Sequence, residues 1–268
     1  MTAVLTAPTT TAGPVTTALA VARRTVRKFV RTPQLVVVGT IQGVMFLLIF
    51  RYVFGGAIGA GGLDYVELHV PGFVVTGVLF TGTGAAAGVA EDMEQGFFDR
   101  LRSLPIPRTS VLTGRSLADT ALVGWGAALT TAVGFAVGFR IETDWLSALA
   151  AFGLIVVFGF AFTWLFITIG LYAGNAQAAQ GMSLLVFPLS FVSSAYVPVD
   201  SMPGWMQAFA EHQPLTAMVD AVRALTLGDT ATAVLGHSTA YYVTTSLLWS
   251  AGLVAAFAPL AVWRYRRG

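Results

Sequence analysis

Residues with catalytic potential are few and scattered in this sequence. His69, His212 and His237 have no carboxylates at metal-ligand spacing, and cysteine is absent. The chain has a single lysine, Lys28, and no GxxxxGK[ST] phosphate-binding loop, so it is not expected to hydrolyse ATP alone. Its apolar stretches carry almost no carboxylates, which argues against the proton or sodium relays of secondary transporters. We therefore expect neither a catalytic site nor a metal site on this chain.

The clearest chemical feature is a polar stretch from Glu91 to Gly114, which reads EDMEQGFFDRLRSLPIPRTSVLTG. It carries four of the chain's 13 acidic residues and three of its 15 basic residues, between long apolar runs. Its mixed charges, followed by Pro105 and Pro107, predict a short helix that stops abruptly. A polar segment between two membrane spans must lie in water, where a soluble protein can reach it. We therefore predict that this stretch, which we call the plug, is the part of the chain that a soluble partner binds.

The composition indicates what kind of secondary structure surrounds this plug and holds it in place. The chain has 268 residues, of which 10% are charged, whereas soluble domains have about 25% charged residues. Several windows hold close to 20 apolar residues, the length that crosses about 30 Å of hydrocarbon. The alternating ten-residue segments of a membrane barrel are absent. The predicted class is an all-α polytopic membrane protein, with a disordered tail over residues 1–17, an interface helix over residues 18–33 and a transmembrane domain over residues 34–268.

The interface helix is predicted from the amphipathic pattern of the segment Leu19–Arg31. At 100° per residue, one face is apolar and the opposite face is basic. The apolar face contains Leu19, Ala22, Val26, Phe29 and Val30, and the basic face contains Arg23, Arg24, Arg27, Lys28 and Arg31. Two readings stay open: an anchor that only sets orientation, or an anchor that also contacts a partner.

Six membrane spans are expected in the rest of the chain. They cover residues 35–54, 70–90, 116–139, 145–172, 181–199 and 241–263, with a kink at Pro188 in the fifth. The Gly-rich segment Gly55–His69 is expected to be an outer loop. Before the last span, Asp200–Gly228 contains two short amphipathic patterns separated by Gln213-Pro214, too short to cross the bilayer. They predict an outer re-entrant or interfacial helical hairpin that ends at Gly228.

Counting basic residues predicts the orientation of these spans. If the N-terminus is cytoplasmic, six spans place the C-terminus inside as well. The inner segments then contain twelve of the 15 basic residues, namely Arg23, Arg24, Arg27, Lys28, Arg31, Arg100, Arg102, Arg108, Arg115, Arg264, Arg266 and Arg267. This bias predicts a multi-pass protein of the bacterial plasma membrane with both termini in the cytoplasm. It also places the polar plug in the cytoplasm.

Asp119 is the only acidic residue inside a predicted span. Arg115 lies four residues earlier on the same helix face, so we expect an ion pair between the two rather than a transport role for Asp119. The spans also contain many aromatic residues, which could contact an apolar cargo. For any single aromatic residue, ordinary packing or lipid contact is the simpler interpretation.

Two stretches carry a resemblance to a known family. The elements E-x-x-x-x-G, D-R-x-R-S-L-P-I-P-R and V-L-x-G-R at the plug resemble the cytoplasmic loop of type-2 ABC transporter permeases, especially the daunorubicin/doxorubicin-resistance exporter branch. The segment Ser194–Leu225, with A-Y-V-P-V-D-S-M-P-G-W-M-Q, resembles the outer segment before the last span of that family. The order of elements is similar over about residues 18–268.

The resemblance implies a permease subunit that is not itself an enzyme and carries no cofactor. Its implied partners are two copies of a separate ABC ATPase, which bind ATP and Mg, and a second copy of the permease or a homologous one. Membrane lipid surrounds the chain, and nucleic acid has no expected role. The loop after the second span would form a coupling helix at residues 91–104. The matching positions are Glu91, Glu94, Phe97, Phe98, Asp99, Arg100 and Arg102, in which Phe97 and Phe98, together with Leu101, would form a hydrophobic knob.

The same resemblance implies outward transport of a hydrophobic or amphipathic compound, such as a drug or polyketide. The first, second and fifth spans line the path in that family, and matching positions here are Phe46, Phe50, Phe80 and Phe187. Export of a lipid or glycan precursor by the same fold is an alternative. A membrane-embedded transferase is a remote alternative, because it would need clustered acids or histidines at a membrane face.

Overall fold

The computed structural model describes residues 13–54 and 65–267, and every regular element in these ranges is a helix, which confirms the predicted all-α class. The expected tail over residues 1–12 and most of the expected outer loop, residues 55–64, lie outside the described residues. The helices are α1 (Pro14–Arg31), α2 (Pro33–Ile49), α3 (Tyr65–Glu94), α4 (Phe97–Arg102), α5 (Arg108–Ala136), α6 (Trp145–Ala173), α7 (Ala176–Leu184), α8 (Pro188–Phe191), α9 (Gly204–His212), α10 (Pro214–Leu227), α11 (Asp229–Leu235) and α12 (Thr239–Arg267), with a π-helical turn η1 (Phe50–Phe54) after α2 and a 3₁₀ turn η2 (Val199–Ser201) before α9.

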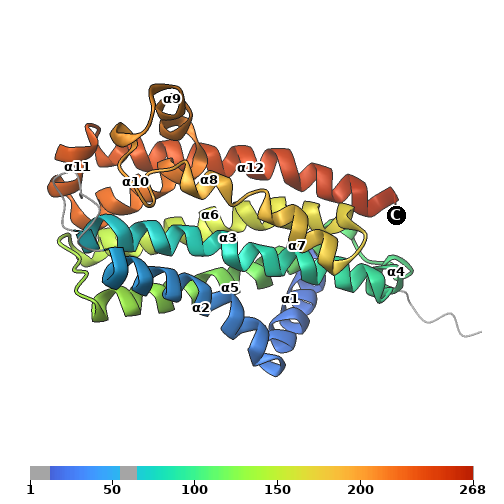
Figure 1. Cartoon of the computed structure of the whole chain (residues 1–268). Coiled ribbons are helices and arrows are strands. Elements are labelled where there is room, and N and C mark those ends of the chain that lie inside the picture. The colour runs from blue at the N-terminus through green and yellow to red at the C-terminus, as the bar shows by residue number, and fades with distance from the viewer. Residues whose placement is uncertain (1–12, 55–64, 268) are drawn as a thin grey trace, which may run out of the picture.

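Four long helices, α3, α5, α6 and α12, form the body of the bundle (Figure 1). Helix α6 packs against the other three, and α2 lies against α3 and α5. In the described part of the chain, α3, α6 and α12 are long and apolar enough to cross a membrane. Since α2 is shorter and α5 carries buried charges, the count of six spans stays a prediction.

Local chain chemistry explains where several helices begin and end. The carboxylate of Asp144 accepts a hydrogen bond from the Ser147 amide at 2.6 Å and caps α6. Gly174 follows the last residue of α6 and has a φ of 78°, a value that is strained for residues with a side chain. Gly228, with φ of 60°, ends α10 as predicted from the sequence.

Three expected spans differ from the structure in their boundaries. The helix expected from residue 70 begins at Tyr65, so residues 65–69, expected in the outer loop, are helical. The helix expected from residue 116 begins eight residues earlier, at Arg108, because Pro107 is extended and the following residues continue the helical pattern. The expected fifth span, residues 181–199, is not one continuous helix. Helix α7 ends at Leu184, and a turn separates it from the short α8 at Pro188. Pro188 lacks an amide hydrogen, so this region breaks where a kink was expected.

Helix α1 begins at Pro14, so residues 14–17, expected in the tail, are helical. It packs against α5 through a face of small residues, including Thr17, Ala18 and Thr25. Gly114 permits this approach, because a Cβ there would lie 2.3 Å from the Ala18 carbonyl oxygen. The predicted apolar face instead stays exposed at Leu19, Val26 and Val30. Helix α1 therefore has three faces: a basic face, an exposed apolar face, and a face of small residues that packs against α5.

The segment before the last long helix contains the two expected short helices, α9 and α10, divided at Gln213. Helix α10 is buried against α3, α6 and α12, whereas α9 stands away from the bundle (Figure 1). The placement of this hairpin relative to a bilayer stays a prediction.

Candidate functional site

The polar stretch lies at one end of the bundle, with the start of α5 and the last turn of α12, and we call this region the α4 end. The helix predicted over residues 91–104 is divided: α3 continues to Glu94, and a turn at Gly96 precedes α4. The φ of Gly96 is 65°, a left-handed conformation that favours glycine and stops the first helix. Glu91 and Glu94 therefore belong to the end of α3, and α4 is a separate short helix.

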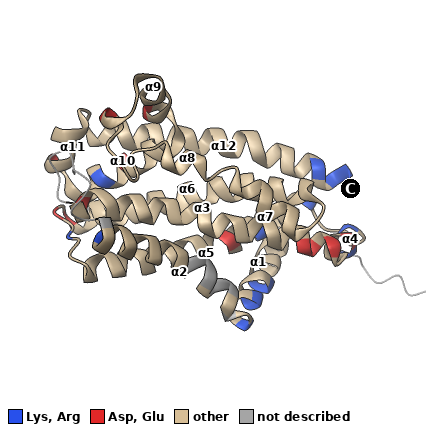
Figure 2. Ribbon diagram, in the orientation of Figure 1, with Lys and Arg blue, Asp and Glu red and all other residues tan. Residues whose placement is uncertain are grey.

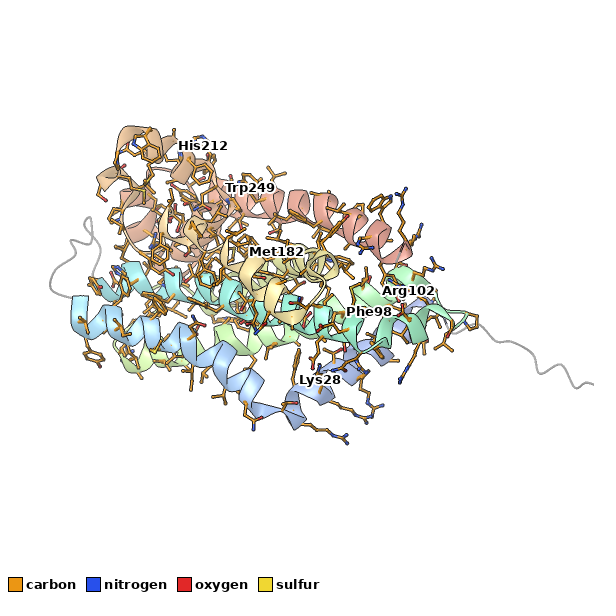
Figure 3. The ribbon with its side chains drawn as sticks, turned by 45° about the vertical axis from the view of Figure 1, so that its right-hand side comes forward. Lys28, Phe98, Arg102, Met182, His212 and Trp249 are labelled. Carbon is orange, nitrogen blue, oxygen red and sulfur yellow. The ribbon has the colours of Figure 1, made fainter. Side chains whose placement is uncertain are left out.

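Phe98 anchors α4 to the bundle. Its side chain is 2% exposed and meets the ring of Tyr265 of α12 edge-on, with 5.3 Å between ring centroids. Figure 3 shows Phe98 and Arg102 at the same end of the molecule as Lys28. The sequence predicted Phe98 as part of a knob for a partner, but in this structure the ring fills the chain's own core. Phe98 is thus placed to position α4.

Phe97 and Arg102 add cationic contacts to the same helix. The Arg24 guanidinium of α1 lies 3.5 Å from the centroid of the half-buried Phe97 ring. Arg102 forms an ion pair with Asp99 at 2.7 Å, and its guanidinium lies 4.7 Å from the Tyr265 ring centroid. Helix α4 is therefore held by both the first and the last helix of the chain.

Several side chains remain accessible at the α4 end, and they include charges of both signs. Glu94, Asp99, Arg100 and Leu104 are exposed, and we call these four residues the exposed rim. Figure 2 shows acidic and basic residues side by side at this end. Opposite charges around one apolar residue can fix the orientation of a docked protein more than they add raw affinity.

A buried charge cluster lies behind the rim. Arg115 of α5 donates to Asp92 at 2.8 Å and to Asp119 at 2.8 Å, and both carboxylates are buried. It also donates to the Ala85 carbonyl of α3 at 3.3 Å. The predicted Arg115–Asp119 pair is confirmed. Gly88 leaves space for the guanidinium, because a Cβ there would lie 2.5 Å from it.

Asp92 was absent from the predicted site residues, although its neighbour Glu91 was included. Asp92 lies four residues after Gly88 and three after Val89, on the packed face of α3, and this spacing was the available signal. Arg24 reaches Asp92 at 3.5 Å, and Lys28 reaches Glu91 at 2.7 Å. Two basic residues of α1 therefore bind two successive carboxylates at the end of α3.

Three of the four predicted path-lining rings lie close together, on α2, on α3 and at the break before α8, and Phe50 lies in the π-helical turn η1. Phe46 stacks on Phe80 with centroids 5.4 Å apart, and Phe80 lies 4.7 Å from Phe187. Phe50 contacts Tyr196 at 5.5 Å and Phe73 at 5.1 Å. Phe46, Phe80 and Phe187 thus form one group of rings around the buried Phe80, and their contact with a cargo stays a prediction.

A second polar cluster, which the sequence analysis missed, lies at the opposite end of the bundle. Arg223 of α10 is 1% exposed and pairs with Asp220 at 3.0 Å. It also donates to the Ser194 carbonyl at 2.7 Å and, through Nε, to the Leu68 carbonyl at 3.1 Å. The i, i+3 spacing of Asp220 and Arg223 was the available signal. This cluster ties the hairpin to α3.

The histidines do not assemble a metal site. His69 contacts the carbonyl oxygens of Tyr65 and Tyr196, whereas His212 and His237 are exposed. Within residues 13–54 and 65–267, no three His, Asp or Glu side chains converge in a way that could hold a metal ion.

Comparison with known proteins gives the family of this chain. Residues 16–227 match the family described as ABC-2 type transporter. The chain is 34% identical over 226 residues to the daunorubicin resistance ABC transporter permease protein DrrB1 of Streptomyces coeruleorubidus, covering 83% of this chain and 76% of that protein. It is 28% identical over 233 residues to the probable doxorubicin resistance ABC transporter permease protein DrrC of Mycobacterium tuberculosis, covering 84% and 79% of the two chains. Nodulation protein J of Rhizobium leguminosarum bv. trifolii is 26% identical over 202 residues, covering 71% and 74%. This chain therefore belongs to the ABC-2 type transporter family and is similar to its drug-resistance permeases.

Proposed function

We propose that this chain is the membrane-spanning permease subunit of an ATP-driven exporter for a hydrophobic or amphipathic compound. The observation that carries the proposal is its similarity, over most of its length, to permeases named for daunorubicin and doxorubicin resistance. In this proposal ATP and Mg bind to a separate ATPase subunit, present in two copies. A second permease, identical or homologous, completes the transport path.

The α4 end is the proposed site of coupling to the ATPase. The exposed rim offers charges of both signs, and Phe98 and Tyr265 fix α4 beneath it. A force on the rim would reach α12 through Phe98, α1 through Phe97, and α5 through the turn that carries Pro105 and Pro107. Because these contacts leave α4 little freedom, the helix is suited to transmit motion rather than absorb it.

The charge distribution supports the orientation in this proposal. The basic residues of α1, the α4–α5 region and the end of α12 gather near one end of the bundle (Figure 2). A cytoplasmic α4 end satisfies the positive-inside rule in the bacterial plasma membrane and faces the ATPase. The aromatic surface of Phe46, Phe80 and Phe187 then belongs to the path for the exported compound.

Inverted membrane vesicles provide the test. Vesicles that contain this chain and a candidate ABC ATPase from the same genome should accumulate a fluorescent amphipathic drug when MgATP is added. Vesicles with either subunit alone, or with a non-hydrolysable ATP analogue, serve as controls. Accumulation without the ATPase, or none with both subunits, would contradict the proposal. Faster ATP hydrolysis with lipids than with drugs would instead favour a lipid or glycan precursor as cargo.

A further inference from the structure

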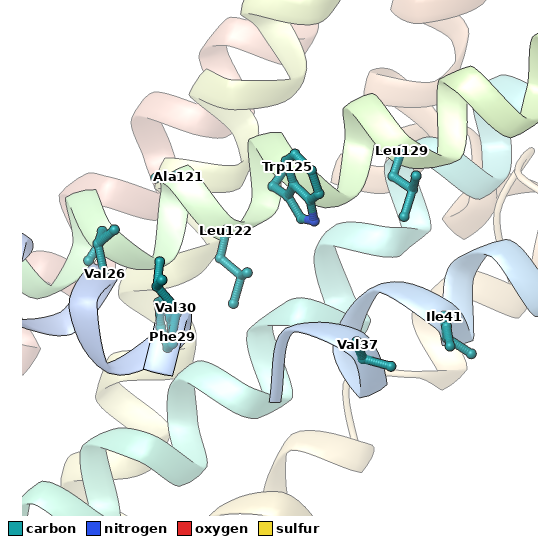
Figure 4. A pocket seen from close by; sticks show the side chains of 10 residues that line it. Val26, Phe29, Val30, Val37, Ile41, Ala121, Leu122, Trp125 and Leu129 are labelled. Atoms are coloured by element: carbon teal, nitrogen blue, oxygen red, sulfur yellow. The ribbon is translucent and has the colours of Figure 1, made fainter. Parts of the chain in front are cut away.

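A large apolar groove lies between α1, α2 and α5, and none of its lining residues belongs to α4 or to the four predicted path-lining rings. It has a volume of about 540 Å³, within the range of about 300–1,000 Å³ that small-molecule sites occupy. Val26 and Val30 of α1, Ile41 of α2, and Leu122, Trp125 and Leu129 of α5 face it (Figure 4). Trp125 is 57% exposed, although it lies in the middle of a long helix.

The dimensions of the groove fit one lipid chain. Its α5 wall runs from Ala118 to Leu129, a rise of about 17 Å in an α-helix. This is close to one leaflet of a hydrocarbon core about 30 Å thick. Figure 4 shows the α1 residues beside Ala121 and Leu122, and Ile41 beside Leu129 farther along α5. The groove therefore begins at the amphipathic helix and runs along the bundle.

Free positive charge lies at the end where the groove begins. Arg23 precedes Val26 by three residues and Arg27 precedes Val30 by three, so each arginine neighbours a groove residue on the helix surface. Both arginines are exposed, and within the described part of the chain neither forms an ion pair. Arg24 and Lys28, by contrast, are already paired with Asp92 and Glu91.

We infer that the groove binds an anionic phospholipid, with one acyl chain between α1, α2 and α5 and the phosphate on Arg23 and Arg27. The apolar wall alone would accept any hydrocarbon, but the two unpaired arginines at its mouth select a negative headgroup. A lipid held in this way would fix α1 at the membrane surface. Because Arg24 and Lys28 sit on the same helix, the lipid would also stabilise their contacts with the end of α3.

Quenching of Trp125 fluorescence tests this inference. The complete chain is reconstituted in phosphatidylcholine vesicles that contain increasing fractions of either brominated phosphatidylglycerol or brominated phosphatidylcholine, matched between the two series. The signal of Trp125 is obtained by subtracting the spectrum of a Trp125→Phe variant. Two arginines should give the anionic lipid a preference on the order of tenfold in the concentration needed for half quenching.

Matched variants separate a specific site from general attraction to the surface. Arg23→Gln with Arg27→Gln should abolish the preference, whereas Arg266→Gln with Arg267→Gln, two exposed arginines of α12, should preserve it. Ala121→Phe should fill the groove and reduce quenching by both lipids. Each variant is checked for monodispersity, and its own Trp125→Phe partner supplies the subtraction.

Three results would overturn the inference. Equal quenching by both lipids would mean that Trp125 meets bulk hydrocarbon without selection. A preference that survives the Arg23 and Arg27 changes would place the headgroup elsewhere. Absence of quenching by either lipid would mean that a second protein chain covers the groove.

Discussion

Two buried arginines, at opposite ends of the bundle, have their positive charges balanced in different ways. Arg223 has one carboxylate, Asp220, and carbonyl partners from two other segments, so its cluster is neutral and closed. Arg115 has two carboxylates, Asp92 and Asp119, which leaves a negative charge. Arg24 of α1, 42% exposed, supplies the balancing positive charge from outside. The first cluster ties the hairpin to α3, and the second is completed by a charge from the surface helix α1.

The largest expected effect comes from opening the closed cluster. Arg223→Met leaves Asp220 buried without its cation and two carbonyls without a donor, which should lower the free energy of unfolding by about 3–5 kcal/mol. Thermal unfolding of the purified chain in detergent would measure the loss. Arg140→Met, an exposed arginine that donates to the Phe135 and Phe139 carbonyls, is the matched control and should change stability by about 1 kcal/mol or less. Equal stability of the two variants would show that the cluster does not lock the hairpin.

Loss of the α4 anchor should have the next largest effect. Phe98→Ala removes a buried ring from its contact with Tyr265, which should cost about 3 kcal/mol. Phe97→Ala, which removes a half-buried ring, should cost clearly less. Hydrogen exchange in residues 97–104 would measure both. If Phe97→Ala exposes α4 more than Phe98→Ala does, the roles assigned to these two rings are reversed.

Substitutions at two adjacent acids at the end of α3 compare the loss of a buried carboxylate with the loss of a partly exposed one. Asp92→Asn leaves Arg115 short of a charge and frees Arg24, and it should lower stability by about 2 kcal/mol. Glu91→Gln disturbs a partly exposed pair with Lys28, which is worth about 0–1 kcal/mol. Chemical denaturation of the two variants makes the comparison. A larger loss for Glu91→Gln would contradict the buried network.

A smaller stability effect than that of Asp92→Asn is expected where α1 packs on α5. Gly114→Ala places a methyl group against the Ala18 backbone and should cost about 1–2 kcal/mol through overpacking. Hydrogen exchange should rise in α1. The control is Gly124→Ala on the same helix, where the new Cβ would lie 3.7 Å from Val156, an ordinary contact. Equal exchange in both variants would mean that α1 is not held by this close approach.

Much of the architecture was predictable because it depends on local chemistry. Hydrophobic length indicated the spans that became α3, α6 and α12, and the Arg115–Asp119 spacing indicated their ion pair. The division of the hairpin at Gln213 and the end of α10 at Gly228 also follow from residues with strong backbone preferences.

The remaining features depend on which residues meet across the bundle, and these contacts cannot be read from the residue spacing of a single sequence. Phe97 and Phe98 are chemically identical neighbours, yet Phe98 is buried in an apolar cluster that includes Tyr265, 167 positions later, whereas Phe97 is only partly buried against it. Asp92 and Glu91 look alike as acids, and only the approach of α5 distinguishes them. The predicted amphipathic face of α1 was correct in composition, but packing used the small residues between its apolar and basic faces.

The central claim is that the exposed rim, and not the buried Phe98 ring, holds a separate ATPase. Co-purification of the tagged permease with the ATPase that supports its transport tests this claim most directly. Arg100→Glu, which reverses an exposed charge on α4, should reduce the retained ATPase by about tenfold while thermal unfolding is unchanged. Arg140→Glu, at the far end of the bundle, is the control and should retain the partner fully. Full retention by Arg100→Glu and by matching reversals at Glu94 and Asp99 would contradict the account.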